Sequence, residues 1–153
     1  MKKSFTKLLL LVCLASCYEK TNPPPQEPGN LPIEGTWKLL TGTLIEKGDT
    51  VITDYTRDKS FIKIINKSHF AFLQHGTGNN PAADFSAGGG RYTLRGNNYT
   101  EHLEYCSAKE WEGHDFTFML TISGDTLIQS GIEKIESEGI NRINTEKYIR
   151  LKN

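Results

Sequence analysis

The chain has 153 residues, with 18 Lys+Arg balanced by 18 Asp+Glu, 37% apolar residues and three cysteines. This length fits one domain, which can bury enough surface to fold without disulfides or a metal. The balanced charge argues against a nucleic-acid-binding protein, because such proteins carry a basic excess. The only segment apolar enough to approach a membrane core lies at the N-terminus.

Residues 1–17 have the layout of a secretory signal. Three lysines precede an apolar run at residues 8–14 that is too short to span a bilayer. The ending Leu14-Ala15-Ser16-Cys17 resembles the lipobox of bacterial lipoproteins, in which cleavage precedes the cysteine and the cysteine is acylated. We therefore expect a lipoprotein signal peptide at residues 1–16 and lipidation of Cys17. The alternatives are a plain signal peptide with an incidental cysteine and a buried core strand.

Cleavage before Cys17 changes the charge and the location of the protein. It removes three lysines and no acidic residue, so the mature chain carries 15 basic and 18 acidic residues. Two or more acyl chains anchor a protein stably. We expect secretion across the inner membrane and a lipid anchor in the outer membrane, with Cys17 as the contact to the membrane. Cys106 then remains the only free thiol, so no intramolecular disulfide can form.

Residues 17–32 are expected to form a tether between the lipid and the folded domain. Five of the six prolines of the chain lie here, among Asn, Gln, Glu and Gly. Such a composition cannot bury apolar surface and favours extended polyproline geometry. The folded domain is therefore expected at residues 33–153.

The pattern of that domain is all-β, with no convincing helical period apart from a turn near residues 108–112. Short strands are separated by Gly, Asn and Asp turns, which predicts an antiparallel up-and-down meander of 8–10 strands, closed as a barrel or folded as a sandwich. The Gly-rich segment 76–90 is interpreted as a loop at the mouth of a barrel. The expected strands are 35–46, 50–55, 61–65, 70–73, 91–95, 98–105, 116–123, 126–131 and 143–151.

Two hairpins can be registered from their two-residue loops, Gly96-Asn97 and Gly124-Asp125. The first loop pairs Leu94 with Tyr99 and Tyr92 with Glu101. The second pairs Ile122 with Leu127 and Leu120 with Gln129. Because side chains alternate along a strand, the expected inward set is Tyr92, Leu94, Tyr99, Glu101, Leu103, Tyr105, Phe116, Phe118, Leu120, Ile122, Leu127 and Gln129.

Glu101 is the most informative member of this set, since a carboxylate among aromatic rings must be paired, hydrogen-bonded or protonated. One interpretation is that an interior Arg or a tyrosine hydroxyl pairs with it and fixes the barrel. The other is that Glu101 and Gln129 are the polar contacts of an apolar ligand cavity. In the last strand, Glu146, Tyr148 and Arg150 share one face, and periodicity alone does not decide whether it points inward.

The two ends of the domain resemble lipocalins and their calycin relatives. Gly35-Thr36-Trp37 is similar to the glycine–any–tryptophan signature of the first strand, and Glu146-Lys147-Tyr148-Ile149-Arg150 is similar to the last strand. The block from Gly88 to Tyr105 resembles lipocalin-like domains of uncharacterised Gram-negative envelope lipoproteins. The resemblance implies a lipocalin-like barrel closed at one end by Arg150 packed on Trp37, with Glu146 and Tyr148 facing inward. The helical lid of fatty-acid-binding proteins is missing after the first strand.

No catalytic constellation emerges from the chain. The four histidines lack metal-ligand spacing, no nucleophile motif is visible, and Glu101 and Glu104 lie on opposite strand faces. We expect no catalytic residue, no metal and no cofactor. The leading hypothesis is a non-enzymatic barrel that binds a small apolar ligand. The alternative is a structural or protein-interaction module with a filled core. The expected ligand-binding residues are Tyr92, Tyr99, Glu101, Leu103, Tyr105, Phe118, Gln129 and Tyr148.

Overall fold

A computed structural model describes residues 31–78 and 85–152. The expected signal peptide, Cys17 and nearly all of the tether lie outside these residues. The described chain is built of strands, with two single-turn 3₁₀ helices, and no helix in it is long and apolar enough to cross a membrane. The elements are β1 Gly35–Glu46, β2 Asp49–Asp54, β3 Lys59–Ile65, β4 His69–Gly76, β5 Ser86–Arg95, β6 Asn98–Cys106, η2 Lys109–Trp111, β7 Asp115–Ser123, β8 Thr126–Ile135, η3 Glu136–Glu138 and β9 Ile140–Arg150.

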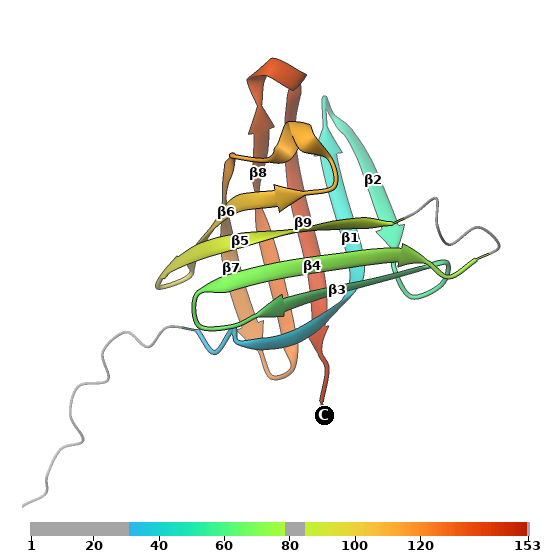
Figure 1. Ribbon diagram of the computed structural model, residues 1–153. Helices are drawn as coiled ribbons and strands as arrows, with labels where there is room; N and C mark the ends of the chain where they lie inside the picture. The colour runs from blue at the N-terminus through green and yellow to red at the C-terminus, as the bar shows by residue number, and fades with distance from the viewer. Residues whose placement is uncertain (1–30, 79–84, 153) are drawn as a thin grey trace, which may run out of the picture.

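These strands form a closed antiparallel barrel. From β3 to β9 each strand pairs with the next, and β9 returns to pair with β1, which in turn pairs with β3. Eight strands thus close the barrel and β2 is additional. In Figure 1, β3 to β6 cross in front of β1, β7, β8 and β9. The expected lipocalin-like barrel is therefore confirmed as the fold class, and the sandwich is excluded.

The long first strand explains how a ninth strand is accommodated. The N-terminal part of β1, Gly35–Lys38, pairs with β3, whereas its C-terminal part, residues 41–46, pairs with β2 along the same edge. The turn between β1 and β2 contains Lys47 and Gly48, both with positive φ. β2 consequently extends the wall of the barrel at the end where β1 has left β3.

Both registers expected from the two-residue loops are confirmed. Leu94 pairs with Tyr99 and Tyr92 with Glu101 in the β5–β6 hairpin. Ile122 pairs with Leu127 and Leu120 with Gln129 in the β7–β8 hairpin. A tight loop leaves few alternative pairings, which is why sequence alone was sufficient here.

The inward position expected for Tyr105 is wrong, because β6 contains a bulge. Gly90 pairs with Leu103 but Gly89 pairs with Tyr105, so Glu104 is an extra residue. One inserted residue reverses the alternation beyond it. Tyr105 is therefore 69% exposed on the outside, and Cys106 faces the interior instead. Glycine is needed opposite the bulge, since a Cβ on Gly90 would lie 2.0 Å from the carbonyl oxygen of His102.

β5 and β8 are longer than expected, because glycines expected in a loop or at a strand end lie within these strands. β5 begins at Ser86, so residues 86–90 belong to a strand and the loop expected over residues 76–90 is wrong for them. β8 continues beyond Gly131 to Ile135. A Cβ at Gly131 would lie 2.3 Å from the carbonyl oxygen of Thr117, so this glycine permits close strand packing rather than ending the strand.

One end of the barrel is closed by side chains around Trp37, which is fully buried. The Trp37 indole Nε1 donates a hydrogen bond of 2.7 Å to the carbonyl oxygen of Ile33, and the Arg150 guanidinium lies 4.0 Å from the indole centroid. Arg150 also donates to the carbonyl oxygens of Pro32 and Glu34. The core around this closed end includes Ile33, Trp37, Leu39, Ile65, Phe70, Tyr99, Leu120, Leu127 and Tyr148.

Candidate functional site: a charged cavity in one half of the barrel

The other half of the barrel is not filled by side chains. It contains a cavity of about 250 Å³, at the end of the barrel opposite to Arg150. The residues that line it come from the C-terminal half of β1 and from β2, β3, β4, β5, β6, η2, β7, β8 and β9, so nearly the whole wall contributes. We call the end that carries this cavity the mouth.

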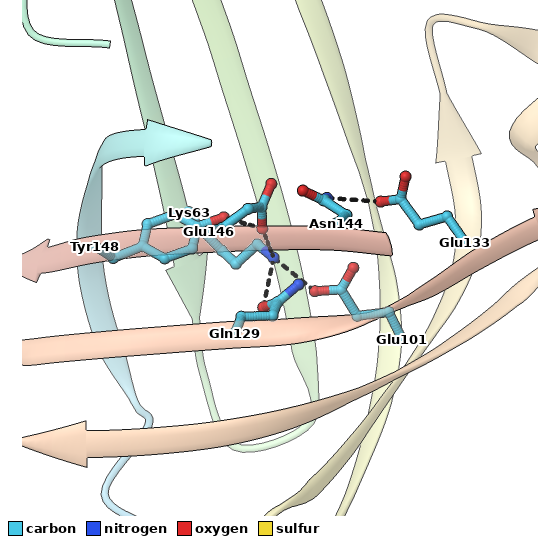
Figure 2. Close-up of polar contacts among 7 residues, drawn as sticks. All are labelled: Lys63, Glu101, Gln129, Glu133, Asn144, Glu146 and Tyr148. Atoms are coloured by element: carbon cyan, nitrogen blue, oxygen red, sulfur yellow. Dashed lines mark hydrogen bonds and ion pairs between the residues drawn. The ribbon is translucent and has the colours of Figure 1, made fainter. Parts of the chain in front are cut away.

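A buried lysine lies at the floor of the cavity. Lys63 is 2% exposed, and its ammonium lies 2.7 Å from Glu101 Oε1 and 3.0 Å from Gln129 Oε1 (Figure 2). The ammonium also lies 5.5 Å from the ring centroid of Tyr148 and 5.8 Å from that of Phe70. β3, β6 and β8 thus each contribute one polar side chain to a single interior node.

Burial and neighbouring charge act against one another at this node. Burial would lower the pKa of Lys63, but the carboxylates, Glu101 first and then Glu146, raise it above its usual value. For Glu101, burial raises the pKa and Lys63 only partly offsets that increase. A buried ion pair contributes little net stability, whereas loss of one partner is costly. The pair therefore stabilises one arrangement of the interior rather than the fold as a whole.

Two tyrosines lie beneath this floor. The Tyr148 hydroxyl donates a hydrogen bond of 2.7 Å to Glu146 Oε2. Burial, reinforced by the charge of nearby carboxylates, raises the pKa of Tyr148 and of Tyr99 well above the usual tyrosine value, so both stay protonated. The Tyr99 hydroxyl lies near Glu101 but makes no hydrogen bond of acceptable geometry within the described chain.

A second polar cluster lies nearer the mouth. Glu133 accepts a hydrogen bond of 2.6 Å from Arg142 Nε through Oε2 and one of 2.8 Å from Asn144 Nδ2 through Oε1. The Arg142 guanidinium lies 4.9 Å from the ring centroid of Trp111 on η2. This short helix therefore places an aromatic ring against a cation of β9 at the rim of the cavity.

Aromatic rings form much of the remaining wall. Phe61 and Phe72 are stacked, with centroids 5.6 Å apart and an interplanar angle of 10°. Phe116 contacts Trp111 with centroids 5.5 Å apart, and Tyr55 meets Phe61 edge to face. The site therefore combines an aromatic wall with a charged and hydrogen-bonded floor, which is the usual composition of a small-molecule pocket.

The residues expected to bind ligand are distributed over three environments. Glu101, Leu103, Phe118 and Gln129 line the cavity. Tyr99 and Tyr148 are fully buried below it, and Tyr92 is half-buried, its hydroxyl donating to the carbonyl oxygen of Asn66. Tyr105 lies outside the barrel, as the bulge requires. The expected inward face of the last strand is confirmed, since Glu146 lines the cavity and Tyr148 is buried.

Sequence reasoning missed the residues that complete the site: Lys63, Trp111, Glu133, Arg142 and Asn144. The partner of Glu101 is a lysine, not the arginine or tyrosine hydroxyl expected. Lys63 shares a face with Phe61 and Ile65, and its burial was signalled by this alternation. Glu133 and Asn144 fall on positions of β8 and β9 that the sequence had left outside the expected strands or unassigned to a face.

Neither a family model nor a curated protein matches the chain. Within residues 31–78 and 85–152, no three His, Cys, Asp or Glu side chains are grouped so that they could hold a metal ion. The geometry of the cavity is therefore the basis for its proposed function.

Proposed function

We propose that the protein is a lipid-anchored envelope lipoprotein whose lipocalin-like barrel binds a small molecule. The observation that carries this proposal is the unfilled half of the barrel, a cavity of about 250 Å³ with aromatic walls above a buried polar floor. At the packing density of protein interiors, this volume holds on the order of a dozen non-hydrogen atoms. The ligand buries an apolar body against the rings and places a polar group toward Glu101, Gln129 and Glu146.

Binding is tested by filling the cavity. The mature domain, gently purified, is examined by native mass spectrometry for a co-purifying small molecule. Leu103→Trp projects a larger ring into the cavity and should abolish the bound mass, because the pocket volume is consumed. Met119→Trp is the matched control, since Met119 is exposed on the outside of β7. Equal occupancy in both variants, or an empty wild type that also ignores small aromatic probes, contradicts the proposal.

The lipid anchor is tested separately in the full-length chain. Cys17→Ser removes the proposed acylation site, and the protein should then leave the detergent phase and the membrane fraction and incorporate no labelled fatty acid. Cys13→Ser is the control, because this cysteine lies inside the proposed signal peptide. If Cys17→Ser remains acylated, Cys17 is not the acylation site, and if the wild type incorporates no labelled fatty acid, the lipoprotein assignment is wrong even where ligand binding holds.

One observation supports the alternative of an interaction module. Ile132 on β8 pairs with Ile143 on β9, and Ile143 pairs with Ile45 on β1, so three isoleucines align across the outside of the barrel. All three are exposed. Exposed apolar rows of this kind mark protein-interaction sites more often than isolated apolar residues do. A triple Ile→Ser variant with unchanged ligand binding and changed assembly would favour this function.

A further inference from the structure

The charged side chains that line the cavity do not balance. Two are cations, Lys63 and Arg142, and three are carboxylates, Glu101, Glu133 and Glu146. Lys63 is matched by Glu101 at 2.7 Å and Arg142 by Glu133 at 2.6 Å. Glu146 is the carboxylate left over, since its only cation within 4 Å among the described residues is Lys63, at 3.8 Å from Oε2. One net negative charge therefore faces the cavity.

Glu146 also has an unused oxygen. Its Oε2 accepts the Tyr148 hydroxyl and is the oxygen nearer Lys63, whereas Oε1 accepts no hydrogen bond within the described chain. Figure 2 shows the second oxygen of this carboxylate directed away from Lys63, toward the side where Asn144 lies. The free acceptor is thus presented to the space above the floor and not to a protein partner.

Asn144 presents a second free acceptor to the same space. This residue is 8% exposed, and its amide nitrogen donates to Glu133 Oε1. A carboxylate only accepts hydrogen bonds, so this contact determines which way the amide is turned. Oδ1 is consequently the atom that points toward Glu146 in Figure 2, and it too accepts nothing from the described residues. Among the described residues the Tyr99 hydroxyl is the only fully buried side-chain polar atom without a partner, so both of these oxygens are open to the cavity and can be reached by a hydrogen-bond donor of a ligand.

We propose that the ligand carries a single positively charged nitrogen, as in a primary amine, which donates to Glu146 Oε1 and Asn144 Oδ1. This inference rests on the proposed function and names the chemical class of the ligand. An anionic headgroup is disfavoured because Lys63 already faces Glu101, Gln129 and Glu146, and Arg142 faces Glu133 and Trp111. The body of the amine lies against the stacked rings of Phe61 and Phe72, which also attract positive charge.

The test compares three probes that share one indole skeleton: tryptamine, tryptophol and indole-3-acetate. They present an ammonium, a hydroxyl and a carboxylate at the same end of the molecule. Isothermal titration calorimetry of the wild-type domain at pH 7 should show tryptamine binding about tenfold or more tighter than the other two, as expected for a charge-assisted hydrogen bond in a buried site. Tryptamine that does not bind, or binds no better than tryptophol, overturns the inference.

Two variants locate the effect. Glu146→Gln keeps an oxygen for the Tyr148 hydroxyl but removes the charge, and should abolish the preference for tryptamine over tryptophol. If thermal melts show that Glu146→Gln does not fold, Asn144→Leu removes the second acceptor and should reduce the preference for tryptamine over tryptophol. Glu138→Gln, on the exposed η3 turn, is the control. Equal binding of all three indoles in the wild type overturns the amine inference yet leaves ligand binding intact, whereas failure of the proposed function appears as insensitivity to Leu103→Trp.

Discussion

The two ends of this barrel are made by the same strands and perform different tasks. At the closed end, Trp37, Leu39, Leu120, Leu127 and Tyr148 are almost completely buried. At the mouth, β3, β6, β8 and β9 contribute charged residues that line about 250 Å³ of unfilled space. Apolar packing supplies most folding free energy, while buried ion pairs supply little. Stability is therefore concentrated at one end, which leaves the other end free to be shaped for a ligand.

Substitution of the two tryptophans should give the largest difference in stability between the closed end and the mouth. Trp37→Ala creates a void in the closed end and should reduce the free energy of unfolding by about 3–5 kcal/mol. Trp111→Ala, at the rim, removes a half-exposed ring and should cost about 1 kcal/mol, while weakening ligand binding. Urea unfolding followed by circular dichroism measures both. Similar losses for the two variants would contradict a division of roles between the ends.

The Lys63–Glu101 pair lies at the floor of the cavity, between the closed end and the mouth, and loss of its lysine alone should also reduce stability. Lys63→Met leaves Glu101 buried without a cation and should reduce stability at neutral pH by about 3–5 kcal/mol. Burial already holds the pKa of Glu101 above its usual value of 4.5, and loss of Lys63 should raise it further. A carboxyl whose pKa is raised by folding stabilises the protein below its unfolded pKa, and that contribution is lost as pH rises through the folded pKa.

The stability of Lys63→Met should consequently fall as pH increases from 4 to 8, measured as the urea midpoint at each pH. The double variant Lys63→Met/Glu101→Gln is the control, because it removes the ionisable group together with its partner. Its midpoint should be close to that of the wild type and should lack the additional pH dependence. A single variant with the same pH profile as the double variant would show that Glu101 is not the group responsible.

The smallest effect is expected for Tyr105, which the bulge in β6 turns to the outside of the barrel. Tyr105→Ala removes an exposed ring and should change the free energy of unfolding by no more than about 0.5 kcal/mol, with ligand binding unaffected. The reason is that the extra residue, Glu104, turns Tyr105 to the outside. Thermal unfolding and the binding assay together check this. A loss of binding in Tyr105→Ala would place this ring in the cavity after all.

The parts of the fold that could be predicted are those set by local chemistry. The loops Gly96-Asn97 and Gly124-Asp125 determine their hairpin registers, and these registers place Glu101 and Gln129 inside on the basis of the sequence alone. Tyr105 could not be placed correctly, because a bulge depends on the close approach of Gly90 to the neighbouring strand and leaves no mark in the alternation itself. The length of β8 was underestimated for a related reason, as Gly131 serves packing and not a turn.

The site was less predictable than the fold, since its members meet only through closure of the barrel. Glu101 and Lys63 are 38 residues apart, and Lys63 and Gln129 are 66 apart. Alternation in β3 indicates that Lys63 points inward with Phe61 and Ile65, but not which carboxylate it meets. Strand order supplies that information, because β3 lies opposite β6 and β8 across the interior and is adjacent to neither.

The clamp formed by Arg150 also brings the two ends of the described chain together. Its guanidinium holds the carbonyl oxygens of Pro32 and Glu34, so the described chain enters and leaves the barrel at the closed end (Figure 1). The mouth lies at the opposite end of the barrel. Under the proposed function, the ligand would therefore exchange at the end of the barrel that is remote from both ends of the described chain.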